Sequence, residues 1–146
     1  MALRDINFFN EEISYTLKDK QEVRKWIQDT VHSEGFKRVG PLSFILCTDE
    51  YLLKINREYL DHDTYTDIVT FDSSEQEDVI EGDIFISIER VIENAAKFNV
   101  FQRDELHRVI IHGVLHLCGY HDKKKQDKEL MTQKENEYLS KRSFLK

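Results

Sequence analysis

The chain has 146 residues, of which 40% are hydrophobic and 11% aromatic, and its formal net charge is −7. This composition argues against intrinsic disorder and predicts one folded domain over residues 1–146. It contains no apolar run near the ~20 residues of a membrane helix, no apolar core of a secretory signal and no CxxC pair, so we expect a cytoplasmic protein with no membrane partner.

Hydrophobic periodicity and turn residues predict an alternation of strands and helices. Two helix starts carry capping signals: Asp19 is followed three residues later by Glu22, and Thr48 precedes a run with helical spacing. In chain order we predict a strand at 3–9, a helix at 19–35, a strand at 42–47, a helix at 48–60, strands at 67–71 and 82–88, and helices at 89–98, 103–118 and 127–140.

These elements predict an α+β fold. The strands at 67–71 and 82–88 are separated by a medium-length acidic loop, which favours an antiparallel pair. We expect a small mixed sheet of four or five strands packed on helices, with the helix at 103–118 near its centre.

The most informative stretch is His112-Gly-Val-Leu-His-Leu-Cys-Gly-Tyr-His-Asp122. His112 and His116 are four residues apart in an apolar helix, which places both imidazoles on one face. Gly119 allows the chain to leave the helix with a positive φ, so that His121 or Asp122 can turn back as a third ligand. Three protein ligands and a fourth position for water are typical of a catalytic zinc site. The alternative, a pair of hydrogen-bonded core histidines, accounts less well for two histidines at this spacing.

Gly113 occupies the position that holds the general base in H-E-x-x-H zinc peptidases, so peptidase activity is disfavoured. Lysines follow the motif directly, at positions 123, 124, 125 and 128. This basic cluster is compatible with a polyanionic substrate, but charge alone favours a solvated helix start.

The motif resembles that of the YbeY family, bacterial endoribonucleases of ribosomal RNA maturation, in which the corresponding sequence is H-G-x-L-H-L-x-G-Y-D-H. Upstream, INREYLDHDTYTDIVTF and EGDIFIS resemble two further family segments in the same order. The resemblance implies a zinc-dependent endonuclease of single-stranded RNA, with one Zn²⁺, that acts on the 3′ end of 16S ribosomal RNA and in ribosome quality control. Its implied partners are ribosomal RNA and the 30S subunit or ribosomal proteins. The oligomeric state stays open.

The resemblance also assigns the site residues. The third family ligand aligns with Asp122, so we expect His112, His116 and Asp122 to bind the metal and to act through it and its water. His121 is the alternative if the turn shifts by one residue. Thr66, Asp67, Tyr120 and Lys123 are expected to contact RNA.

One family residue is missing. The arginine that follows the family tyrosine aligns with Leu60, so another cation must replace it, with Lys54, Arg57, Arg103 and the run 123–125 as candidates. Its loss leaves two alternatives: a non-catalytic ribosome assembly factor with a structural metal, or a metallohydrolase of another substrate. The general base is not assigned.

Overall fold

The computed structural model describes residues 5–145. Residues 3 and 4 of the expected first strand lie outside this range. The elements, in chain order, are β1 (Ile6–Glu11), α1 (Lys20–Ser33), β2 (Arg38–Cys47), α2 (Asp49–Leu60), β3 (Ile68–Asp72), β4 (Val79–Ser87), α3 (Ile88–Phe98), α4 (Gln102–Leu117) and α5 (Lys125–Leu139).

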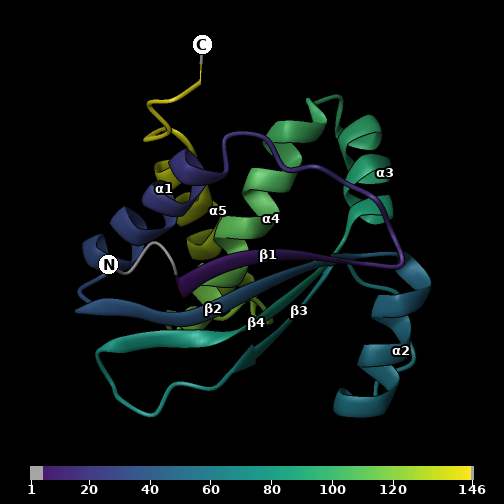
Figure 1. Cartoon of the computed structure of the whole chain (residues 1–146), viewed down its shortest axis with the longest axis horizontal. Helices are drawn as coiled ribbons and strands as arrows, with labels where there is room; N and C mark the ends of the chain where they lie inside the picture. The colour runs from purple at the N-terminus through teal and green to yellow at the C-terminus, as the bar shows by residue number, and fades with distance from the viewer. Residues whose placement is uncertain (1–4, 146) are drawn as a thin grey trace.

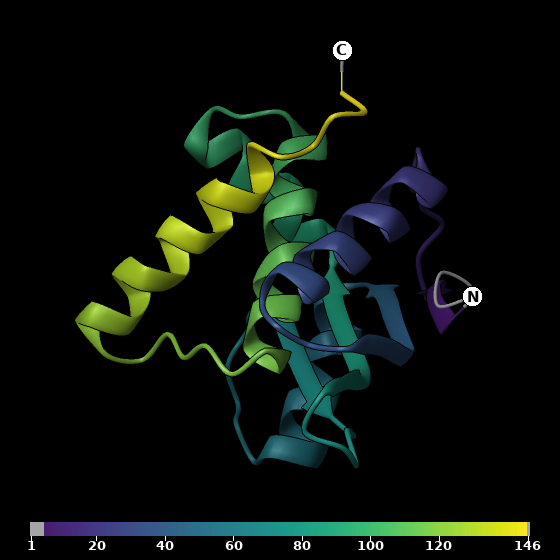
Figure 2. The ribbon, with the colours of Figure 1, turned by 90° about the vertical axis from the view of Figure 1, so that its left-hand side faces the viewer.

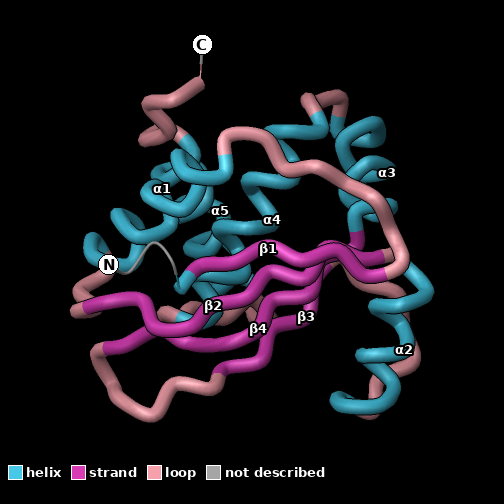
Figure 3. Tube along the Cα trace, viewed as in Figure 1, coloured by secondary structure: helices cyan, strands magenta, loops and turns pink. Residues whose placement is uncertain are grey.

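The four strands form one mixed sheet in the order β1-β2-β4-β3 (Figures 1 and 3). β1 pairs with β2, and β2 with β4, in parallel, whereas β3 and β4 are antiparallel. The α+β class and the antiparallel β3–β4 pair are therefore confirmed, with four strands. No helix among residues 5–145 is long and apolar enough to span a membrane.

The main core lies between the sheet and α1, α4 and α5, which cover the same face (Figure 1). Alternate residues of β2 point toward the helices, so Leu42, Phe44 and Leu46 are buried there. On the other face, α2 covers one end of the sheet, where Leu52 packs on Cys47 and Val69. The strand pairs fix one register, in which Ile84 lies opposite both Phe44 and Thr70.

The α4 helix lies at the centre of the helical layer, where it contacts α1, α3, α5, β3 and β4 (Figure 2). Gly113 permits a close approach to the sheet, because a Cβ there would lie 2.9 Å from Ile68 Cδ1 and 3.0 Å from Ile84 Cγ2. The central helix expected from the sequence is thus present and packs directly against β3 and β4.

The helix ends agree only in part with the capping signals. Thr48 Oγ1 accepts a hydrogen bond from the Tyr51 backbone N–H at 3.1 Å, as expected for a cap. Asp19 does precede α1, but its backbone adopts the left-handed conformation and its side chain makes no capping hydrogen bond. The predicted side-chain cap at Asp19 was therefore wrong. The α3 helix begins after Ser87, whose hydroxyl accepts from the Arg90 N–H.

Candidate metal centre

Three side chains from the histidine motif converge on one point. His112 Nε2 and His116 Nε2 are 2.9 Å apart, and Asp122 Oδ2 lies 3.2 Å from the first and 3.3 Å from the second. These are the residues among the described part of the chain whose donor atoms could jointly hold a metal ion. His121, the alternative third ligand, is exposed and does not join this group.

The end of α4 explains how Asp122 returns to the histidines. Gly119 has φ of 107°. Its N–H donates to the His116 carbonyl and the Tyr120 N–H donates to the Leu115 carbonyl, each at 3.0 Å. This pair of bonds is a Schellman motif, which reverses the chain at a helix C-terminus. The segment between α4 and α5 then places Asp122 Oδ2 within 3.2 Å and 3.3 Å of the two imidazoles.

The other ring nitrogen of each histidine is held by an acceptor. His112 Nδ1 is 2.6 Å from Glu135 Oε2, and His116 Nδ1 is 3.0 Å from the Tyr120 carbonyl oxygen. Because a carbonyl oxygen and a carboxylate only accept hydrogen bonds, both Nδ1 atoms carry hydrogen. Both Nε2 atoms therefore present lone pairs in their neutral form, directed at each other and at the Asp122 carboxylate.

This arrangement fits a divalent metal ion. Ligand atoms that are each ~2.0–2.1 Å from a tetrahedral zinc lie ~3.3 Å from one another, which is close to the 3.2 Å and 3.3 Å separations from Asp122 Oδ2 to the two imidazoles. Three lone-pair donors that face one another repel unless a cation lies among them. Orientation of the ligand imidazoles through Nδ1 is also a regular feature of protein metal sites.

The surrounding charges act differently on the two imidazoles. Burial alone would lower the pKa of His112, but the hydrogen bond and charge of Glu135, helped by Asp122, raise it above its ordinary value. Burial and the neighbouring His112 lower the pKa of His116. The Glu135 carboxylate is itself oriented by Arg108, whose Nη1 donates to Oε1 at 2.7 Å. Arg108 of α4 thus orients Glu135 of α5, and Glu135 in turn orients the His112 imidazole.

A cavity of about 540 Å³ opens beside the three residues. Of the expected RNA contacts, Thr66, Asp67 and Lys123 line it. Burial raises the pKa of Asp67, although the nearby His112 opposes this shift. The cavity thus gathers residues from the loop before β3, from α4 and from the segment after it.

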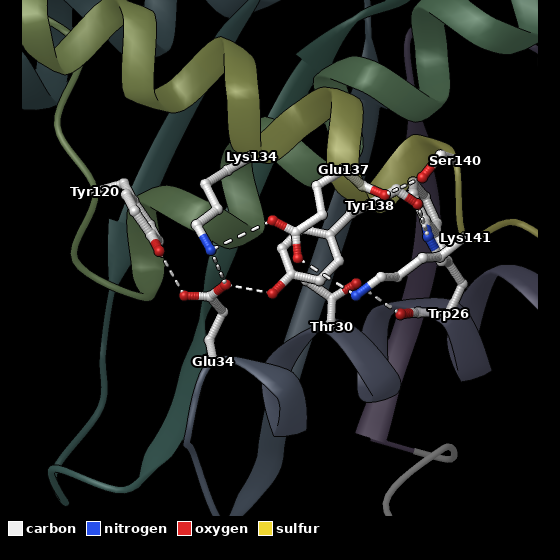
Figure 4. Close-up of polar contacts among 9 residues, drawn as sticks. All are labelled: Trp26, Thr30, Glu34, Tyr120, Lys134, Glu137, Tyr138, Ser140 and Lys141. Atoms are coloured by element: carbon white, nitrogen blue, oxygen red, sulfur yellow. Dashed lines mark hydrogen bonds and ion pairs between the residues drawn. The ribbon is translucent and has the colours of Figure 1, made fainter.

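Tyr120 lies elsewhere and is not among the residues that line the cavity. Its hydroxyl donates to Glu34 Oε1 at 2.7 Å, and Glu34 also accepts from Tyr138 and pairs with Lys134 (Figure 4). The side chain that was expected to contact RNA therefore faces α1 and α5, because the turn after Gly119 directs it away from the histidines. The backbone carbonyl of Tyr120, not its ring, contacts the site.

Leu60, which aligns with the family arginine, lines the cavity. Of the cations considered as replacements, Arg57 pairs with Asp63 and Arg103 with Asp104, outside the cavity lining. Lys123 does line it, and so does Arg108, which the sequence reasoning missed.

Two acidic residues of the cavity were also missed. Glu135 keeps only 8% of its side-chain area exposed and contacts His112, and Glu105 lines the same cavity. The available signal was periodicity: Glu135 shares the buried face of α5 with Met131 and Tyr138, and Glu105 lies on the His112 face of α4, seven residues earlier. An acid at an apolar position is unusual unless it is paired or functional.

Two further residues with potential ligand atoms stay outside the site. Asp83 is exposed on β4 between Gly82 and Ile84, of which Ile84 faces α4. Asp83 therefore points to the opposite face of the sheet, and Glu135 and the Tyr120 carbonyl hold the ligand imidazoles instead. Cys118 packs against the main core.

Comparisons with known proteins show which family and fold this chain resembles. A family model described as Endoribonuclease YbeY matches residues 5–143. Proteins named Endoribonuclease YbeY from Cytophaga hutchinsonii and Christiangramia forsetii are 50% and 51% identical, covering 99% and 96% of this chain and 100% and 96% of their own. The solution structure of TM1509 from Thermotoga maritima matches with a TM-score of 0.65 at 28% identity, over 94% of this chain and 88% of that one.

Proposed function

Because the chain belongs to the YbeY endoribonuclease family and is thereby a nuclease acting on RNA, we propose that it is a zinc-dependent endonuclease of single-stranded RNA. Its proposed role is maturation of the 3′ end of 16S ribosomal RNA and ribosome quality control, in the cytoplasm, with the 30S subunit or its proteins as partners. The whole chain serves as one catalytic domain. The observation that carries the proposal is the convergence of His112, His116 and Asp122 beside a cavity.

The proposed metal ligands are His112 Nε2, His116 Nε2 and one oxygen of Asp122, around one Zn²⁺. When bound, the ion supplies a Lewis acid that activates water and offsets charge on a phosphoryl oxygen. Asp122 brings a negative charge where the family has an imidazole. It therefore makes the site more tolerant of harder divalent ions.

The chain's own residues hold the RNA. Lys123 is exposed on the cavity rim, directly after the third ligand, and among residues 5–145 it has no ion-pair partner. Its ammonium is thus free for a phosphate, and we assign it the role of the missing arginine at Leu60. Arg108 is less available, since its guanidinium already binds Glu135 and Asn136. Thr66 and Asp67 also line the cavity and orient the RNA strand.

Metal content and RNA cleavage test the proposal together. The purified parent should contain about one equivalent of zinc and cleave a single-stranded RNA, whereas His116→Ala and Asp122→Ala should lose most of the zinc and reduce cleavage at least 100-fold. His121→Ala is the matched control, because its exposed side chain lies outside the ligand group.

Each failure has a different meaning. Zinc retention by Asp122→Ala with loss in His121→Ala would transfer the third ligand to His121. A zinc-loaded parent that associates with 30S subunits but cleaves no RNA would favour an assembly factor with a structural metal, the alternative that the loss of the arginine at Leu60 suggests. Cleavage of peptides or small amides, but not RNA, would reassign the substrate.

A further inference from the structure

Glu105 lines the cavity with a carboxylate that has no protein partner. The residue is 7% exposed and lines the cavity, and its carboxylate takes part in none of the side-chain hydrogen bonds or ion pairs found within residues 5–145. Within these residues, the enclosed side-chain polar atoms that lack a partner do not include the Glu105 oxygens. These oxygens are therefore open to the cavity, where a ligand can reach them.

The neighbouring side chains do not supply that partner. Arg108, one turn later on α4, directs its guanidinium to Glu135 and Asn136 on α5. Burial, and then the like charge of Asp67, raises the pKa of Glu105, although the charge of Arg108 opposes this shift. Both oxygens of Glu105 are therefore left to accept hydrogen bonds from whatever fills the cavity.

The position of Glu105 indicates which part of an RNA it meets. Glu105, Arg108 and His112 lie on one face of α4, and seven residues of helix place Glu105 ~10 Å from His112 along the axis. With a phosphate at the metal centre, that distance corresponds to the base of a flanking nucleotide rather than to the scissile bond. The cavity of about 540 Å³ has room for a nucleotide.

We propose that Glu105 forms a base-recognition subsite that selects guanine next to the cleaved bond. The inference rests on the proposed function. Proteins read single-stranded RNA through the Watson–Crick edges of unstacked bases. Guanine presents two adjacent donors there, N1–H and N2–H, which match the two free oxygens of a carboxylate. In adenine, cytosine and uracil each donor on this edge lies beside an acceptor, which a carboxylate repels.

Cleavage of a pool of single-stranded RNAs with randomised bases tests the subsite. The zinc-loaded parent should enrich guanine at one position flanking the cut, and Glu105→Gln should reduce that enrichment about tenfold or more, since one good bidentate contact discriminates bases by that much. The zinc content of Glu105→Gln should stay within about twofold of the parent. Glu129→Gln, an exposed acid on α5, is the matched control and should keep the preference.

Binding of free nucleotides separates this inference from the proposed function. By NMR titration, the zinc-loaded parent should bind GMP at least about tenfold more tightly than AMP, CMP or UMP, and Glu105→Gln should lose the difference. If the parent cleaves no RNA but binds GMP selectively through Glu105, the proposed endonuclease function is wrong and the guanine subsite is supported. A parent without guanine preference in both assays, or a Glu105→Gln variant that keeps it, overturns the subsite.

Discussion

At the residue scale, the metal centre depends on one side chain that is distant in sequence. Glu135 lies 23 residues after His112 and orients its ring through a 2.6 Å contact to Nδ1. It is held in place by Arg108, so its position is fixed independently of any metal. Residues that orient ligand imidazoles in this way contribute to metal affinity although they never touch the ion.

We expect Glu135→Gln to weaken zinc binding about 10–100-fold, because the amide keeps the shape but loses the charge that makes His112 a stronger donor. Competition with a chromophoric chelator would measure the affinity. Glu137→Gln, two residues later on the same helix and exposed, is the control and should match the parent. Equal affinities for all three proteins would contradict a role for Glu135 at the metal.

At the element scale, the position of α4 depends on its close approach to the sheet at Gly113. Gly113 faces Ile68 and Ile84, where an added Cβ would meet side-chain carbons at 2.9 Å and 3.0 Å. The position that carries the general base in zinc peptidases is therefore packed against the sheet. A glutamate there would collide with Ile68 and Ile84, which gives the sequence argument against peptidase activity a structural basis.

Gly113→Ala should destabilise the protein by about 1–3 kcal/mol, because two isoleucines and the helix must shift to make room. Alanine is a better helix former than glycine by about 1 kcal/mol, so the net loss can fall near the lower end. Urea unfolding would measure it, with Thr132→Ala on the exposed face of α5 as the comparison. An unchanged or raised stability in Gly113→Ala would show that the close approach does not constrain the helix.

The turn after α4 is attached to α1 and α5 by Glu34. The Tyr120 hydroxyl donates to Glu34 (Figure 4). The Tyr120 carbonyl accepts from His116 Nδ1. One residue thus connects the hydrogen bonds around Glu34 to a metal-ligand candidate. We infer that the hydroxyl helps to keep this carbonyl, and Asp122 two residues later, in place.

Tyr120→Phe should lower zinc affinity about 3–10-fold, a smaller effect than at Glu135 because the hydroxyl acts through the backbone. Tyr138→Phe is the matched control: it also removes a hydrogen bond to Glu34, but from α5. Both variants should lose about 0.5–1.5 kcal/mol of stability, and only Tyr120→Phe should affect the chelator titration. Equal zinc affinities in the two variants would limit Tyr120 to a packing role.

The sequence predicted what local periodicity controls. The spacing of His112 and His116, the glycine that ends α4 and the antiparallel β3–β4 pair all depend on residues close together in the chain. The parallel order β1-β2-β4 and the Glu135 contact could not be derived in that way, because both join segments that only the folded chain brings together. Asp19 shows a further limit: its residue type suits a cap, but its left-handed backbone prevents the capping bond.

At the scale of the whole molecule, the segment after α5 closes the helical layer over a buried histidine. Trp26 Nε1 on α1 donates to the Tyr138 carbonyl at 2.8 Å, and Trp26 and Phe144 both pack against His107 of α4. Arg142 Nη1 donates to His107 Nδ1 at 2.9 Å, which requires a neutral imidazole at that nitrogen. This contact joins the C-terminal segment to the central helix.

Stability should therefore fall as the solution becomes acidic. Burial, and then the charge of Arg142, lowers the pKa of His107 from 6.5 to about 4. Between these two values the unfolded chain binds a proton that the folded protein excludes, so stability is lost as the pH falls through this window. At pH 5 the loss relative to pH 7.5 is about 2 kcal/mol.

Urea unfolding of the chelator-treated protein at both pH values would measure this loss. His107→Gln keeps an acceptor for Arg142 but does not titrate, so it should be less stable at pH 7.5 and yet lose about 2 kcal/mol less than the parent on going to pH 5. His32→Gln, an exposed histidine on α1, should retain the full pH dependence of the parent. If His107→Gln instead showed the parental pH dependence, the acid sensitivity would have to come from groups other than the imidazole beneath the C-terminal segment.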